Sequence, residues 1–220
     1  MKKLLALLLA AATLFAAAAC QRRAEIPEPP APETTSPQTT PEETPAESPE
    51  GTAPTSGDKK GTGGEVYTDT IMLEGMAETV SYARVNGTFD YTMPMDVDRF
   101  EYVPTEEKDY FICALNEHVW MSVEHFQTAT WEEVREKLPE WPDEAIVSEN
   151  DMTLTENKYE TRHVHVVYGT SPDSAVLDYY IVRDNSGGCY LITHCYFLEG
   201  AEGWGARMTY MAEGFRIEKA

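Results

Sequence analysis

The sequence predicts an α+β domain, an antiparallel β-sheet of about six or seven strands with two helices packed on it. Three observations predict this class. Runs of aromatic and β-branched residues, separated by turn residues, fill most of positions 65–220. Two stretches show helical periodicity instead. Regular helices do not alternate with the strand runs, as they would in a parallel sheet.

The first strand pair lies on either side of Asn86-Gly87. Residues 80–85 and 88–93 both read as strands, and Asn-Gly between two such runs is a strong signal for a two-residue hairpin turn. Asn86-Gly87-Thr88 also forms a glycosylation acceptor, but the turn explains the same residues. Further strands are expected at 98–103, 109–115 and 118–126.

A helix is predicted to follow at Thr130, where the periodicity changes. Thr130 and Glu133 have the spacing of a capping box, in which each side chain bonds the backbone amide of the other residue. Trp131, Val134 and Leu138 follow at helical spacing, and Pro139 ends the helix. A loop is expected from 141 to about 150.

Three longer strands and a helix complete the domain. The strands are expected at 159–168, 175–183 and 189–198, and the last two are joined by the glycine-containing loop 184–188. Both faces of 189–198 are apolar, which predicts a central strand with layers above and below it. The final helix, about 201–213, has one apolar face made by Trp204, Met208, Met211 and Phe215.

This element order resembles a known family. The order and the ending, Cys189-Tyr190-Leu191-Ile192 through Gly203-Trp204-Gly205-Ala206-Arg207-Met208 to Phe215-Arg216-Ile217, look like the PsbP/Mog1-like sandwich of lipoproteins from Gram-positive anaerobes. The resemblance implies that fold for residues 65–220. Named members of the superfamily bind a photosystem or a small GTPase. Nothing in this sequence matches their binding sites, so no residue role is carried over.

The N-terminal twenty residues predict the location of the protein. Lys2 and Lys3 precede an apolar run over 4–19, and three alanines lead into Cys20. This pattern is that of a signal peptide, residues 1–19, and is too short for a membrane span. It resembles the leader of bacterial lipoproteins, although that family more often has leucine at the position of Ala17. The resemblance implies that Cys20 carries a diacylglycerol anchor on the extracytoplasmic face of the cell membrane. The alternative is an ordinary signal peptide with a nearby cysteine.

Residues 20–64 are predicted to be the lipidated cysteine followed by a disordered tether. Nine of the fourteen prolines fall here, among Thr, Ser, Glu and Ala, and Ile26 is the one large aliphatic residue of the segment. Such a composition cannot bury a core. The chain is also acidic, with a formal charge of −21. This charge argues against binding nucleic acid and against lying flat on an anionic membrane.

The remaining cysteines of the domain, Cys113, Cys189 and Cys195, are expected to face inward. Cys189 and Cys195 lie six residues apart on one strand, about 20 Å apart, which is too far for a disulfide between them. A bridge from Cys113 to either of them remains open, and so do three free thiols. The sequence contains no Cys-x-x-Cys, so a zinc ribbon is not supported.

The histidines supply weak candidates for a metal site. His163 and His165 lie two apart and share one strand face, and His194 is placed on what we expect to be a neighbouring strand. Three imidazoles there could bind Zn²⁺. The alternative is surface or cross-strand packing, so neither a metal nor another cofactor is predicted.

No convincing catalytic constellation is present, and an enzyme is not predicted. The loop 184–188 is similar to the nucleophile loop of chymotrypsin-like proteases, but Asn185 replaces the acid before Ser186, and a hairpin loop explains the same residues. The predicted function is a lipid-anchored binding or accessory module, with the membrane and an envelope protein as partners. The alternatives are a small-ligand or cation-binding lipoprotein and a metal-dependent hydrolase that uses His163, His165 and His194.

Overall fold

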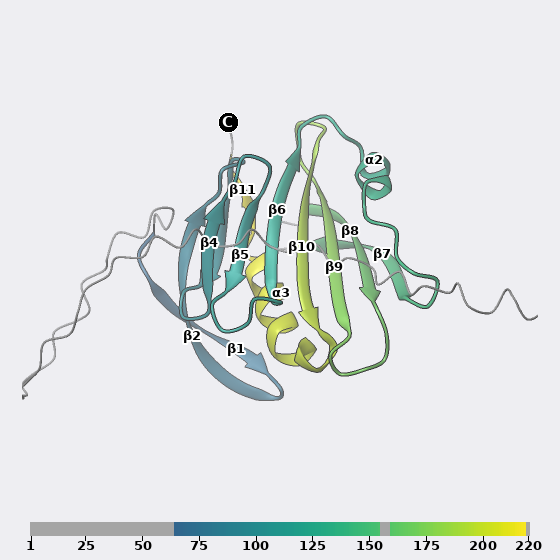
Figure 1. The fold of residues 1–220 in the computed structure, drawn as a ribbon. Helices are drawn as coiled ribbons and strands as arrows, with labels where there is room; N and C mark the ends of the chain where they lie inside the picture. The colour runs from purple at the N-terminus through teal and green to yellow at the C-terminus, as the bar shows by residue number, and fades with distance from the viewer. Residues whose placement is uncertain (1–63, 155–158, 219–220) are drawn as a thin grey trace, which may run out of the picture.

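A computed structural model describes residues 64–154 and 159–218. In this part of the chain two antiparallel sheets pack with two α-helices (Figure 1). The predicted α+β class is therefore confirmed. The predicted signal peptide, Cys20 and the tether lie outside the described residues.

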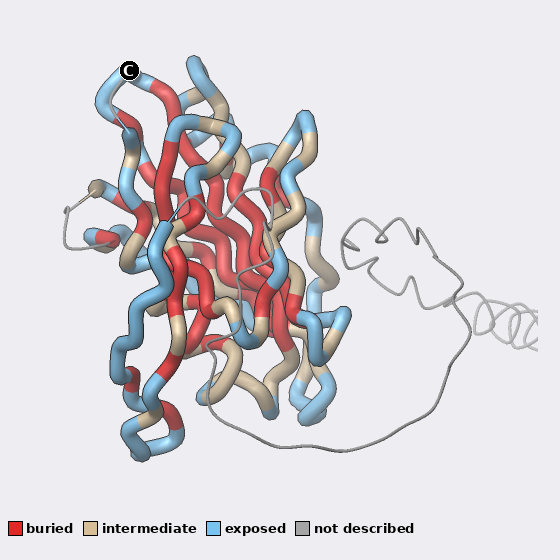
Figure 2. The backbone as a smooth tube through the Cα atoms, turned by 90° about the vertical axis from the view of Figure 1, so that its left-hand side faces the viewer, coloured by how far each residue is buried: buried red, intermediate tan, exposed pale blue. Residues whose placement is uncertain are grey.

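The larger sheet has seven strands in the order β4-β5-β6-β10-β9-β8-β7, and every neighbouring pair is antiparallel. Strand β10 lies at its centre, and all but one of its residues are buried, as its two apolar faces predicted. Figure 2 shows that buried residues fill the middle of the domain, while exposed residues lie mainly in the outer turns. The strands are β4 Phe100–Pro104, β5 Asp109–Cys113, β6 Trp120–Phe126, β7 Ile146–Leu154, β8 Tyr159–Val167, β9 Ala175–Arg183 and β10 Cys189–Phe197.

The smaller sheet has four strands in the order β1-β2-β3-β11. The sequence predicted a single sheet, whereas the structure divides the strands between two sheets. Strand β11 was not predicted, because a strand of two residues, one exposed and one half-buried, gives no periodic signal. The strands are β1 Tyr67–Leu73, β2 Met76–Asn86, β3 Tyr91–Asp96 and β11 Arg216–Ile217.

Both predicted helices are present. Helix α2, Trp131–Glu136, begins with the predicted capping box, since Thr130 and Glu133 bond each other's backbone amides. The C-terminal helix α3, Ala206–Glu213, is shorter than expected. A 3₁₀ turn, η1 Leu198–Gly200, and a π-helix, η2 Ala201–Gly205, precede it. The first five residues of the expected helix therefore form a π-helix, whose turn is wider than the 3.6-residue turn of an α-helix.

The two faces of the seven-stranded sheet carry two separate cores. One face packs against the four-stranded sheet and α3. The core between them includes Tyr180 and Ile192 from the large sheet and Met208 from α3. The other face packs against α2 through residues such as Trp131 and Leu177. A strand such as β9 therefore sends alternate side chains into different cores, which explains why seven of its nine residues are buried.

The first hairpin has a wider turn than Asn86-Gly87 predicted. The Gly87 amide donates to the Tyr91 carbonyl, and β3 begins at Tyr91 instead of at 88. The Thr88 amide donates to Asp109 on β5, which holds the turn open. A tertiary hydrogen bond thus overrides the local preference for a two-residue turn.

Besides β11, strands β1 and β7 were not predicted, because they are largely exposed. Strand β7 begins in the middle of the expected loop 141–150, occupies its second half and is an edge strand of its sheet. Its polar centre, with Glu149 and Asp151 among exposed neighbours, gives no alternating apolar pattern. Strand β1 is likewise the edge strand of the smaller sheet, and its first four residues are exposed. Edge strands need few apolar residues, since one side of each faces solvent.

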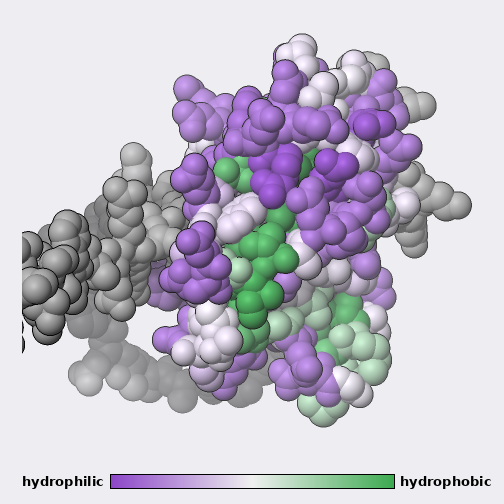
Figure 3. Space-filling view, turned by 90° about the vertical axis from the view of Figure 1, so that its right-hand side faces the viewer, coloured by the Kyte–Doolittle hydropathy of each residue, from purple (hydrophilic) through white to green (hydrophobic). Residues whose placement is uncertain are grey.

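The surface at the β7 side is mostly hydrophilic, with a strip of hydrophobic side chains through its middle (Figure 3). Among the large apolar residues of β7, Ile146 and Val147 are exposed. Within the described ranges no helix is long and apolar enough to cross a membrane.

Candidate metal centre

The order of strands β8, β9 and β10 brings a polar cluster together on one face of the large sheet. His163 and His165 alternate on β8 and so share a face. In the register of β8 with β9, His165 lies opposite Asp178 and His163 lies opposite Tyr180. Asp178 in turn lies opposite His194 on β10. A carboxylate therefore stands in the row between two imidazoles.

Asp178 accepts hydrogen bonds from three side chains. His163 Nε2 and His165 Nδ1 each lie 2.7 Å from Asp178 Oδ1. The Tyr196 hydroxyl donates to Asp178 Oδ2 over the same distance, 2.7 Å. The Asp178 side chain is 8% exposed, while those of His163 and His165 are 19% and 34% exposed. The carboxylate thus forms the floor of the cluster, and the two imidazoles form its rim.

The protonation of the cluster follows from these bonds. Burial acts to raise the pKa of Asp178, but the hydrogen bonds from both histidines and from Tyr196 outweigh it and hold the pKa well below its ordinary value. Its bond to Asp178 raises the pKa of His165 against the opposing effect of burial. An ionised carboxylate only accepts, so both imidazoles donate to it in this arrangement.

The same three groups can serve as metal ligands. One ligand atom from each of His163, His165 and Asp178 lies within 4.8 Å of the others. Tetrahedral zinc with bonds near 2.0–2.1 Å holds its ligand atoms about 3.3 Å apart. The 2.7 Å hydrogen bonds would therefore open by roughly 0.6 Å when a metal replaced the two protons. His165 is the more exposed of the two histidines, at 34%, so its ring has the greater freedom to move by this distance.

His194 does not lie where the sequence predicted. Strand β9 separates β10 from β8, so His194 is two strands away from His163 and His165. Its side chain is fully buried, and neither ring nitrogen has a hydrogen-bond partner among the described residues. Burial lowers the pKa of His194 to about 4, which keeps the ring neutral. The structure therefore does not bring the three candidate histidines into one ligand group, and Asp178 joins His163 and His165 instead.

Asp178 was missed, although the sequence carried a signal for it. It is the one acidic residue within the apolar run 175–182. Aspartate is almost never fully buried unless it is paired. An acid within the apolar strand 175–183 is therefore expected to have a partner, and a histidine pair on another strand is a suitable one.

The three cysteines of the described residues are free and buried. Cys113 belongs to the core under the four-stranded sheet, whereas Cys189 and Cys195 belong to the core under α2. The sheet itself separates them, so the open alternative of a bridge from Cys113 is wrong. Burial raises the pKa of all three thiols, to about 11 for Cys189 and about 12 for Cys195.

The loop 184–188 is a hairpin loop held by Asp184. Asp184 Oδ1 accepts from the Ser186 amide, the Ser186 hydroxyl and the Gly188 amide. Its Oδ2 lies 2.9 Å from His125 Nε2, and the His125 ring stacks on Tyr190. Ser186 therefore bonds the acid and not the histidine, which is not the arrangement of a serine protease.

Asp184 should make stability depend on pH in the acid range. Burial acts to raise its pKa, but the bonds from His125, Gly188 and Ser186 lower it to about 2. A pKa below the unfolded value of about 3.9 stabilises the fold above that value, and the effect is lost as pH falls through about 2. Between about pH 5 and pH 2 the wild type should lose about 2 kcal/mol more stability than Asp184→Asn. Urea unfolding at several pH values measures this difference, and parallel curves for the two proteins would contradict it.

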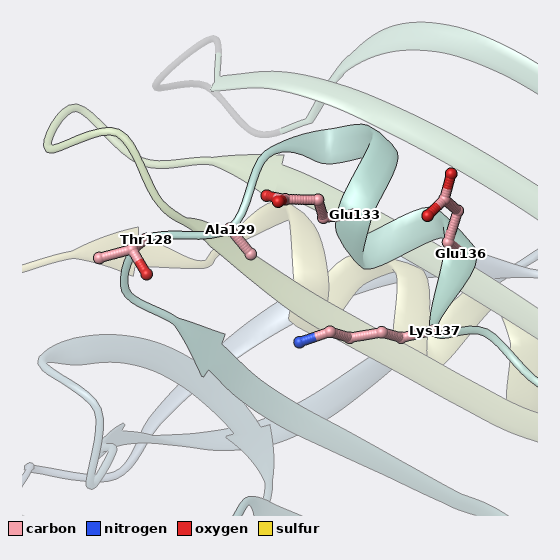
Figure 4. Close-up of a pocket in the computed structure, with 5 residues that line it drawn as sticks. All are labelled: Thr128, Ala129, Glu133, Glu136 and Lys137. Carbon is pink, nitrogen blue, oxygen red and sulfur yellow. The ribbon is translucent and has the colours of Figure 1, made fainter.

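A surface hollow lies away from the cluster. Thr128, Ala129, Glu133, Glu136 and Lys137 line it, beside helix α2 (Figure 4). Helix α2 covers the opposite face of the sheet from Asp178. No histidine or buried acid lines this hollow, so the cluster on β8 and β9 is the stronger candidate.

Comparisons with known proteins give a fold likeness and no function. No family model matches the chain, and no curated protein matches it. The chain is similar to the solution structure of cyanobacterial PsbP (CyanoP) from Synechocystis sp. PCC 6803, with a TM-score of 0.42 and 8% identity. The match covers 74% of this chain and 97% of that one. A likeness at this TM-score carries no conclusion about ligands or partners.

Proposed function

We propose that this chain is a lipid-anchored extracytoplasmic binding module that holds one divalent transition-metal ion. The observation that carries the proposal is the convergence of His163, His165 and Asp178, with one ligand atom from each within 4.8 Å. Two imidazoles and one carboxylate suit zinc and related borderline ions better than Mg²⁺ or Ca²⁺, which prefer oxygen ligands. An enzyme is not part of the proposal.

The surroundings of the three ligands support a binding site. Tyr196 holds the second oxygen of Asp178 and so orients the carboxylate. Metal ligands are commonly fixed in this way by an outer hydrogen bond. His163 stacks on Tyr180 with ring centroids 4.5 Å apart, which limits the positions that its ring can take. The ligands are therefore preorganised, with the partly exposed rim as the entry path.

The test is metal uptake by the full chain. Protein loaded with Zn²⁺ and then desalted should retain one ion per chain in elemental analysis. Calorimetric titration should give one site for Zn²⁺ and no comparable binding of Mg²⁺. Zinc retention no higher than that of an unloaded sample would overturn the proposal.

The anchor rests on Cys20 and has its own test. Replacing Cys20 with serine removes the thiol that the lipid would modify, so the protein should leave the membrane fraction or accumulate unprocessed. One lipid group with two chains binds a membrane stably, while a single chain is marginal. Fractionation and immunoblotting measure this, with Cys113→Ser as the matched control. Unchanged membrane retention of Cys20→Ser would contradict the anchor. An envelope protein partner stays a prediction.

A further inference from the structure

The three protein ligands leave a coordination position unfilled. Zinc in proteins is most often four-coordinate, and sites with three protein ligands keep the fourth position for water or another donor. His163 and His165 each offer one nitrogen, and Asp178 offers one carboxylate oxygen, of which Oδ1 is the one that both nitrogens approach. Its Oδ2 accepts from Tyr196, so the carboxylate binds through one oxygen. Three positions are thus taken.

No other side chain of the described ranges belongs to this ligand group. His194 is fully buried on β10, on the far side of β9 from the two rim histidines. On the near side, the edge strand β7 places Ser148 opposite His165 and Asn150 opposite His163. Both of these residues are exposed. The partly exposed imidazoles and the exposed β7 residues form the solvent-accessible side of the cluster, and from this side a fourth ligand can reach a bound metal.

The charge of the loaded site limits what can bind there. A divalent ion bound to the carboxylate of Asp178, which carries one negative charge as a metal ligand, leaves one positive charge at the cluster. The chain as a whole carries −21, which disfavours ligands with several negative charges. A neutral nitrogen base or a monovalent anion fits both conditions.

We propose that the metal-loaded site exchanges its water for one external monodentate donor, either an imidazole-type nitrogen or a small monovalent anion. This inference rests on the proposed function, because the donor binds the metal held by His163, His165 and Asp178. The exchange forms one metal–donor bond and breaks one metal–water bond, with no change in oxidation state. The module then recognises its ligand through the metal.

Cobalt substitution tests the inference. The full chain loaded with Co²⁺ should show visible absorption bands of a low-coordinate site, and these bands should shift saturably when imidazole or azide is added. Bound cobalt is measured before and after each titration. His118→Ala removes an exposed histidine outside the cluster and should respond as the wild type does.

The outcomes separate the two proposals. If Co²⁺ and Zn²⁺ both fail to bind, the proposed function fails. If Co²⁺ binds but its bands are unchanged by both donors, the metal site stands and the external position is overturned. A loss of the bands together with loss of cobalt from the protein also overturns it, since the donor then strips the metal instead of joining it.

Discussion

Replacing Asp178 with alanine should lower the free energy of unfolding by about 3 kcal/mol or more. The substitution removes the acceptor of three hydrogen bonds and leaves the buried Tyr196 hydroxyl without its partner. Breaking a buried, hydrogen-bonded charge cluster on one side is costly because the other groups stay desolvated. Urea unfolding followed by circular dichroism measures the change.

Asp151→Ala is the matched control for this prediction. Asp151 lies on the neighbouring strand β7, pairs with Arg162 and is 67% exposed. Its loss should cost about 1 kcal/mol or less, as for other exposed ion pairs. Asp178→Asn adds a second comparison, because it keeps the shape of the side chain and removes its charge. Equal unfolding midpoints for Asp178→Ala and Asp151→Ala would show that Asp178 does not support the fold.

The double substitution His163→Ala and His165→Ala should lower zinc affinity by roughly 100-fold or more. Loss of an outer-shell partner alone typically weakens a metal site by about 10- to 100-fold, and here two direct ligands are removed. The double variant should also be less stable than the wild type because, of its three side-chain donors, the buried Asp178 keeps only Tyr196. Calorimetry gives the affinity, and circular dichroism checks the fold. His118→Ala should bind zinc as the wild type does, and unchanged affinity in the double variant would contradict the assignment.

The fold could be predicted from residues with a strong periodic signal. The capping box at Thr130, the strand 175–183 and the buried strand at 189 were all placed correctly. In each case local chemistry and burial agree. The exposed strands β1 and β7 could not be found in the same way, because their partners and not their own apolar residues hold them in place.

The sequence pointed to two of the three residues of the candidate metal site, His163 and His165, and not to Asp178. The shared face of His163 and His165 follows from strand periodicity alone. Strands β8, β9 and β10 follow one another in the chain and pair as consecutive antiparallel strands, so β9 with Asp178 lies beside β8, and β10 with His194 lies one strand farther away. The prediction placed His194 beside the histidine pair because it considered histidines alone, and Asp178 was overlooked.

The state of the histidine ring nitrogens tests the metal centre most directly. Long-range ¹H–¹⁵N correlation spectra of the full chain, recorded with and without Zn²⁺, report which ring nitrogens bind the metal. We expect His163 Nε2 and His165 Nδ1 to change to metal-bound shifts, and the ring nitrogens of His118 and His125 to stay unchanged. Unchanged shifts of His163 and His165, or metal-bound shifts at His118 or His125 instead, would contradict it.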